Sequence, residues 1–125
     1  MKYNIKSTDI VLTPAISEYA EKKLNNLDRF VAPENTEKLM CYVELGKSTN
    51  HHKKGEIFMA EFTVHIGGKV FRAKAQEEDL YAAIDIATES LGEELKSFKN
   101  KEKSLIRRTG ARVKNFVKGL YGSDE

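Results

Sequence analysis

Apolar and polar residues alternate along four stretches of the chain, and such alternation is typical of strands that turn one face toward a core. The stretches are residues 2–6, 39–45, 58–66 and 70–75. Gly67 and Gly68 separate the last two stretches, and because both tolerate a positive φ they predict a tight hairpin. The residues predicted to point inward on the last three strands are Leu39, Cys41, Val43, Leu45, Phe58, Ala60, Phe62, Val64, Ile66, Phe71, Ala73 and Ala75.

Two other stretches carry apolar residues at helical spacing. Thr13 and Pro14 predict the start of the first helix, as N-cap and first helical residue, and this helix ends near Asp28. The second begins near Asp79, just after Glu77 and Glu78, whose charges suit the positive end of a helix dipole. The two apolar stripes are Ile16, Tyr19, Ala20, Leu24 and Leu27, and Ala83, Ile84, Ala87, Leu91, Leu95 and Phe98.

The predicted order of elements is therefore β-α-β-β-β-α, an α+β arrangement. Helices with a single apolar stripe bury it best when they lie side by side on one face of a sheet. We expect a four-stranded sheet with two helices packed on one face and the other face toward solvent. The N-terminal strand joins this sheet beside the second strand.

The charge of the chain is unevenly distributed. The total is only +2, but residues 1–95 hold 12 basic and 16 acidic side chains, whereas residues 96–125 hold 9 basic and 3 acidic ones. We therefore expect one folded domain, residues 1–100, and a basic amphipathic tail, residues 101–125. The tail has the spacing of a helix interrupted near Gly110.

The sequence offers little support for enzyme chemistry. Cys41 is the only cysteine, which excludes an internal disulfide and fits a reducing, cytoplasmic setting, and its alternation predicts a buried thiol. His51 and His52 lie in a polar loop without metal-ligand spacing, and His65 is a surface residue. We find neither a signal peptide nor a membrane span, and expect no catalytic residue, metal, cofactor or small-molecule substrate.

Binding to a polyanion is better supported. If both helices lie on the same side of the sheet, the basic residues of the helices, of the last strand and of the tail can line one edge. Such an edge could bind RNA phosphates. The alternatives are ordinary surface lysines and, for the tail, an anionic membrane surface. The candidate RNA-binding residues are Lys22, Lys23, Arg29, Arg72, Lys74, Lys96, Lys99, Lys101, Lys103, Arg107 and Arg108.

Two sequence blocks carry a resemblance. The first is Leu12-Thr13-Pro14-Ala15-Ile16, followed by Tyr19, Lys23-Leu24, Leu27 and Arg29-Phe30. The second, more specific block is Glu78-Asp79-Leu80-Tyr81-Ala82-Ala83-Ile84-Asp85. In this order, with a hairpin between them, they resemble the ribosome hibernation promoting factor family, which includes the ribosome-associated inhibitor protein Y. The resemblance covers about residues 1–101.

The resemblance implies a cytoplasmic domain with an architecture similar to double-stranded RNA-binding domains. Such proteins bind the small ribosomal subunit and its rRNA between head and body, where messenger RNA and the A- and P-site tRNAs lie. They silence idle ribosomes in stationary phase or stress by occlusion, without turnover. We expect a monomer away from the ribosome and no membrane partner.

The family's RNA-contacting positions are matched only in part. Lys23 and Arg29 match basic positions of the first helix, and Lys96, Lys99 and Lys101 match basic positions of the second. Relatives also carry basic residues where this chain has Ser90, Glu93 and Ser97. Our hypothesis is that the tail supplies the missing contacts. Residues 102–125 are too few for the dimerisation domain of the family's long form, which implies a short form or a truncated chain.

Overall fold

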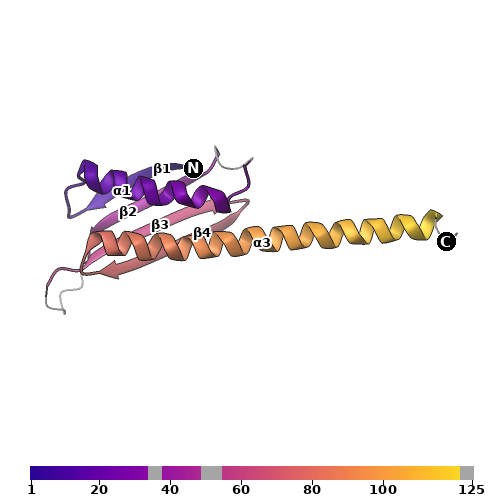
Figure 1. Ribbon diagram of the computed structural model, residues 1–125. Coiled ribbons are helices and arrows are strands. Elements are labelled where there is room, and N and C mark those ends of the chain that lie inside the picture. The colour runs from indigo at the N-terminus through magenta and orange to yellow at the C-terminus, as the bar shows by residue number, and fades with distance from the viewer. Residues whose placement is uncertain (34–37, 49–54, 122–125) are drawn as a thin grey trace.

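A computed structural model of the chain describes residues 1–33, 38–48 and 55–121, and for residues 111–121 the backbone alone. The element order confirms the predicted β-α-β-β-β-α arrangement (Figure 1). A 3-10 helix, η1, extends the first helix. The elements are β1 (Lys2–Thr8), α1 (Pro14–Asn25), η1 (Asn26–Phe30), β2 (Met40–Lys47), β3 (Phe58–Ile66), β4 (Lys69–Glu77) and α3 (Leu80–Tyr121).

The strands form one mixed sheet in the order β1-β2-β3-β4. β1 lies beside β2, as expected for the N-terminal strand. This pair is parallel, and the other pairs are antiparallel. A parallel pair needs a long crossover, which α1 and η1 supply. The register aligns Tyr3, Cys41, Val64 and Phe71 in one row across the sheet, so that a continuous set of apolar side chains faces the helices.

The core lies between the sheet and the two helices that cover one of its faces, α1 and α3 (Figure 1). Every second strand residue points into this layer, as the alternation predicts. The intervening residues lie on the open face, where most are at least partly exposed and Thr63 is buried. The largest fully buried side chains come from all of these layers and are Phe62, Leu24, Leu45, Ile84, Leu91, Leu95, Val64 and Cys41. The predicted two-layer α+β fold is therefore confirmed.

Local signals in the sequence fix the ends of the elements. Thr13 Oγ1 accepts a hydrogen bond from the Ile16 backbone N–H at 3.2 Å, which caps α1. Asp79 Oδ1 accepts one from the Tyr81 N–H at 3.3 Å at the start of α3. Gly67 and Gly68 have φ of 54° and 83°, so the predicted hairpin between β3 and β4 uses the conformation that glycine favours.

The predicted interruption near Gly110 is wrong, because α3 continues through it to Tyr121. A single glycine costs a helix interior only about 1 kcal/mol relative to alanine, too little to break an otherwise helical run. Among the side chains that the structure describes, Phe98 makes the last ring contact between α3 and the sheet, 5.1 Å between centroids from Phe71. Residues 101–121, which we call the arm, carry α3 beyond the sheet (Figure 1). The division of the chain at residue 100 stays a prediction.

Gly46 should be essential to the pairing of β1 with β2. A Cβ at this position would lie 2.5 Å from the backbone carbonyl oxygen of Thr8, its cross-strand neighbour. Backbone cannot move aside as a flexible side chain can, so we expect Gly46→Ala to lower the free energy of unfolding by about 1–3 kcal/mol in urea denaturation. Gly110→Ala is the matched control, because nothing lies within 4 Å of its added Cβ. Equal stability of the two variants would contradict this reading.

Candidate nucleic-acid interface

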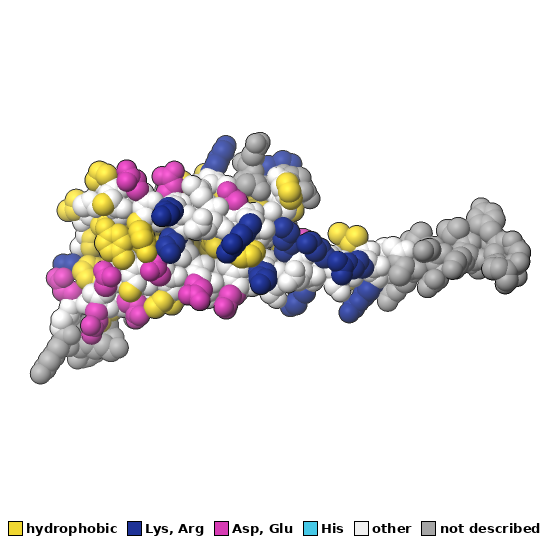
Figure 2. Space-filling view, in the orientation of Figure 1, with side chains coloured by type: hydrophobic (Ala, Val, Ile, Leu, Met, Phe, Trp, Pro, Cys, Tyr) yellow, Lys and Arg dark blue, Asp and Glu magenta, His cyan; other side chains and the backbone are white. Residues whose placement is uncertain are grey.

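Charge is segregated by sign along α3 and the turn that precedes it. Residues 77–95 contain seven carboxylates and no lysine or arginine, whereas residues 96–108 contain six basic side chains and one acidic one. Figure 2 shows acidic side chains gathered over the start of α3 and basic ones over its middle and along the described part of the arm. A polyanion that approaches this helix is therefore repelled at its start and attracted toward the arm.

A groove separates α3 from α1 and η1. Gly92 allows the close approach of η1, since a Cβ there would lie 3.0 Å from Leu27 Cδ2. Leu27, Thr88 and Glu89 line both of the adjoining hollows that form the groove. Their other lining residues are Lys23, Asn26 and Asp85 in one hollow and Arg29, Phe30, Gly92, Glu93 and Lys96 in the other. The groove thus brings together three predicted RNA-binding residues.

An ionic cluster at one end of this groove ties α1 to α3. The Tyr19 hydroxyl donates a hydrogen bond to Asp85 Oδ1 at 2.5 Å, and Lys23 Nζ lies 3.3 Å from the same oxygen. The Asp85 carboxylate raises the pKa of both Tyr19 and Lys23, so the lysine is protonated and the phenol neutral at physiological pH. Lys23 therefore already has an acidic partner, and binding a phosphate means exchanging or sharing it.

Lys99 and Arg29 meet at the other end of the groove. Lys99 Nζ donates a hydrogen bond to the Arg29 backbone carbonyl at 2.9 Å, which satisfies an acceptor at the end of η1. The Arg29 guanidinium lies 4.7 Å from the centroid of the Phe30 ring, a cation–π contact. The hydrogen bond holds two cationic residues from distant parts of the sequence side by side.

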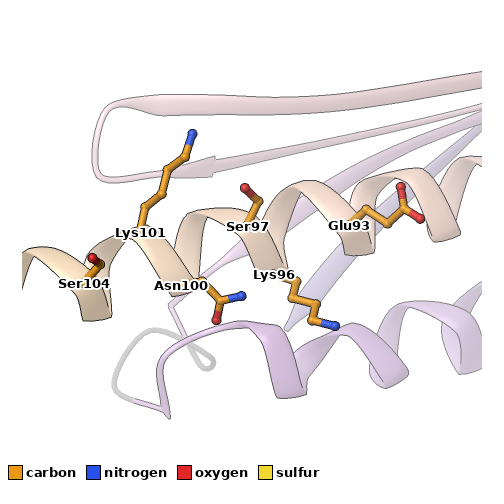
Figure 3. Close-up of a pocket in the computed structure, with 6 residues that line it drawn as sticks. All are labelled: Glu93, Lys96, Ser97, Asn100, Lys101 and Ser104. Carbon is orange, nitrogen blue, oxygen red and sulfur yellow. The ribbon is translucent and has the colours of Figure 1, made fainter.

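A stripe along α3 leads from this site toward the arm (Figure 3). Its members recur at steps of three and four, so they form a continuous strip along the helix. Lys96 extends toward the α1–η1 segment and Lys101 to the opposite side of α3 in Figure 3. The stripe lines an open hollow and consists of Glu93, Lys96, Ser97, Asn100, Lys101 and Ser104.

The three positions at which the resemblance led us to expect basic residues lie in or beside this stripe. Ser90, Glu93 and Ser97 are all exposed on α3, without a cation among them. Further along, Lys103, Arg107 and Arg108 are exposed on the arm, and no ion pair forms with them within the described residues. Lys22, on α1, is also exposed.

Arg72 and Lys74 do not join the other candidates, so the expectation of one continuous basic edge is wrong for them. On β4 they alternate with Phe71, Ala73 and Ala75, which are buried against the helices. Because successive strand residues point to opposite faces, Arg72 and Lys74 lie on the open face of the sheet. The alternation of residues 70–75 in the sequence predicts the same orientation for these two cations.

The remaining candidates have structural explanations. Cys41 is fully buried, and burial raises the pKa of its thiol to about 12, as expected for an inert core cysteine. His65 is exposed, as predicted. Glu77 and Glu78 lie at the connection between β4 and α3. His51 and His52 lie outside the described residues. Within the described part of the chain, no helix is long and apolar enough to cross a membrane.

The sequence of this chain is similar to one family of known proteins. The sequence model of the family described as sigma 54 modulation protein / S30EA ribosomal protein matches residues 3–103. A ribosome hibernation promoting factor of Azotobacter vinelandii is 31% identical over 112 residues, covering 90% of this chain and 94% of that protein. A ribosome hibernation promotion factor of Bacillus subtilis (strain 168) is 28% identical over 99% of this chain, which spans only 61% of that relative's length.

Two solved structures share the fold. The N-terminal domain of protein Y from Thermus thermophilus superimposes with a TM-score of 0.63 at 34% identity, covering 78% of this chain and 99% of that one. A ribosomal subunit interface protein from Coxiella burnetii gives a TM-score of 0.62 at 19% identity, covering 80% and 99%. The second match supports the fold alone.

The Tyr19–Asp85 hydrogen bond should contribute measurably to stability. We expect Tyr19→Phe to lower the free energy of unfolding by about 1 kcal/mol, because it leaves the Asp85 carboxylate without its phenol donor. Tyr42→Phe removes the same atom from an exposed ring whose hydroxyl has no hydrogen bond within the described residues, and serves as the matched control. Urea denaturation of both variants tests this, and equal losses would refute it.

Cys41 should react with alkylating reagents only when the chain unfolds. The pKa of its thiol rises from 9.0 to about 12 on folding, so the folded state favours the protonated form. This contribution to stability is complete below pH 9 and is lost as the pH rises toward 12. Mass spectrometry after iodoacetamide treatment at about pH 8, well below that pKa, should show no adduct in buffer and one adduct in denaturant. Rapid labelling of the folded chain would contradict this assignment.

Proposed function

This chain belongs to the family described as sigma 54 modulation protein / S30EA ribosomal protein, and from this membership we propose that it is a ribosome hibernation factor that binds the small ribosomal subunit. Relatives that match over most of their own length or over most of this chain are named as ribosome hibernation factors. The partner is the ribosome, and the contact that we propose is with rRNA of the small subunit.

The observation that carries the rRNA contact is the basic half of α3. Lys96, Lys101, Lys103, Arg107 and Arg108 are exposed, and none forms an ion pair within the described residues. Unpaired cations on one rigid helix repel each other, and a phosphate backbone relieves that repulsion while releasing its own counterions. Lys23 and Arg29 add cations across the groove, where Lys99 of α3 contacts the Arg29 backbone. Lys22 is exposed on α1, next to Lys23.

The arm takes the place of the missing helix cations in this proposal. Ser90, Glu93 and Ser97 leave three positions without a cation in the part of α3 that covers the sheet. The arm restores it further along the same helix, at a rise of about 1.5 Å per residue. Arg107 and Arg108 thus lie about three to five turns beyond those positions. The same rRNA strand, or a neighbouring one, would be reached by the arm instead of the domain.

The proposed mechanism is competitive occlusion. The domain lies in the channel that messenger RNA and the A- and P-site tRNAs otherwise occupy, and the bound subunit cannot initiate translation in stationary phase or stress. Occlusion requires tight binding and no bond breaking, so it needs neither a catalytic residue nor a cofactor. This setting also implies a cytoplasmic protein.

A second candidate rests on the apolar residues of the arm. Leu105 and Ile106 are 61% and 71% exposed and lie directly beside Arg107 and Arg108. A basic helix with exposed apolar residues also suits an anionic membrane surface or a nonribosomal RNA. Flotation with anionic vesicles tests the membrane alternative, since a factor that binds only RNA or ribosomes stays in the unbound fraction.

Binding to isolated small subunits should depend on the arm and on salt. We expect Arg107→Gln/Arg108→Gln, and more strongly deletion of residues 102–125, to weaken binding and flatten the plot of log affinity against log salt, by roughly 0.9 per lost phosphate contact. Lys38→Gln/Lys47→Gln removes two cations outside the groove and the arm and should leave the slope unchanged.

Unchanged affinity and slope after deletion of residues 102–125 would contradict the proposed role of the arm. Occlusion itself would be contradicted if the intact chain bound with the same affinity to empty subunits and to subunits occupied by messenger RNA and tRNA. The two outcomes are independent, because the first concerns the arm and the second the position of the domain.

A further inference from the structure

The open face of the sheet carries an exposed aromatic pair that neither the core nor the groove uses. Tyr42, on β2, is 53% exposed, and its ring makes an edge-to-face contact with His65 on β3, 6.4 Å between centroids. An exposed ring on a sheet face offers an apolar surface of the size of a nucleobase, and base–aromatic stacking is tolerant of sequence.

A cation lies on one side of this aromatic pair, in the same row as Tyr42. Asn4, Tyr42, Thr63 and Arg72 lie opposite one another in a single row across the four strands. Arg72 Nε donates to Thr63 Oγ1 at 3.4 Å, so the guanidinium extends over β3 in the direction of Tyr42. One strand, β3, lies between Tyr42 on β2 and Arg72 on β4, so the two residues are two strand spacings, about 10 Å, apart.

The next row places two acceptors between two cations. Lys6, Glu44, Glu61 and Lys74 lie opposite one another on β1, β2, β3 and β4. Glu44 and Glu61 are direct cross-strand neighbours, an arrangement that is unfavourable for like charges. Both line a shallow hollow together with Asn4, Lys6, Tyr42, Val43 and Thr63. A ligand that brings N–H donors into this hollow would relieve the repulsion.

We propose that the open face binds single-stranded RNA, with one base stacked on Tyr42 and the amino group of a base directed at Glu44 and Glu61. Arg72 and Lys74 on one side and Lys6 on the other hold the phosphates. Carboxylates accept hydrogen bonds from exocyclic amino groups but repel the carbonyl oxygens of uracil. The surface therefore prefers adenine or cytosine over uracil, and it is distinct from the groove and the arm on the other face.

Charge complementarity favours RNA over other occupants of this face. Lys2, Lys6, Arg72 and Lys74 outnumber Glu44 and Glu61, and the cations lie on the outer strands, where a backbone can run past the hollow. A second copy of the chain would present the same mixture of charges, and a lipid surface would be repelled by two central carboxylates. Single-stranded RNA satisfies the ring, the carboxylates and the cations together.

Fluorescence anisotropy of labelled oligo(A) and oligo(U) of equal length tests the proposal on the purified full chain. We expect the intact chain to prefer oligo(A), and Tyr42→Ala to lose at least about fivefold of that affinity. Tyr42→Phe keeps the ring and should stay within twofold of the intact chain. Glu44→Gln/Glu61→Gln should abolish the preference, because a glutamine amide can also donate to uracil.

The arm provides the internal control. Arg107→Gln/Arg108→Gln should lower affinity for both oligonucleotides and flatten the salt dependence while leaving the ratio of oligo(A) to oligo(U) unchanged. Equal binding of the two by the intact chain, or an unchanged affinity of Tyr42→Ala for oligo(A), would overturn the proposal. If Tyr42→Ala does not fold, Arg72→Gln at the exposed edge strand replaces it, with the same expectation. Small-subunit binding is measured separately, so failure here does not affect the proposed function.

Discussion

The packing of α3 against β3 and β4 is the contact on which the rest of the structure depends. Ile84, Leu91 and Leu95 are fully buried in it, and each such side chain contributes about 1.5–3 kcal/mol through removal of apolar surface from water. The same helix fixes α1 through Asp85 and η1 through Lys99, so it determines the width of the groove. Beyond Phe98 it carries the arm as a continuous extension. Core, groove and arm are therefore oriented by one rigid element, and a shift in its packing would move all three.

The charge gradient along α3 serves both the helix and its proposed partner. Carboxylates gather before and within its first half and cations in its second half, the order that complements a helix dipole, although the dipole acts only within the terminal turns. For a polyanion, the same gradient gives the surface a direction, since the start of α3 repels phosphates and the arm attracts them. The ion pair between Lys23 and Asp85 belongs to this pattern, because it places one cation of the groove against the acidic half. We infer that the cations of the arm, which have no such partner, contribute most to the electrostatic binding.

Most of the fold could be predicted from local sequence patterns, because alternation and helical spacing determine which face of each element is buried. Thr13, Pro14, Gly67 and Gly68 marked ends and turns through conformations that depend on neighbouring residues alone. The continuation of α3 through Gly110 could not be predicted from the glycine alone. Helix formation is cooperative, so the residues on both sides can offset the small free-energy cost of one glycine. The candidate nucleic-acid interface was harder to predict from the sequence than the fold. Tyr19 and Asp85 are 66 residues apart, and a local sequence pattern does not reveal a contact between residues so far apart. The contact matters because the same carboxylate pairs with Lys23 and so competes with a phosphate for it. Arg72 and Lys74, by contrast, could be assigned to the open face from the sequence, because they alternate with the buried residues of the same strand.

The open face and the helix face of this domain differ in the kind of RNA that each suits. The groove and the arm offer cations on rigid helices, which bind a phosphate backbone by position, whereas the open face offers a ring and acceptors, which bind exposed bases. The central claim remains that the chain is a ribosome-bound hibernation factor. Sucrose-gradient fractionation of stationary-phase lysate at low salt, with the chain detected by antibody, tests it most directly. The account predicts the chain in the fractions that contain small subunits and its release at high salt; a chain found only in the ribosome-free fractions at the top of the gradient would contradict it.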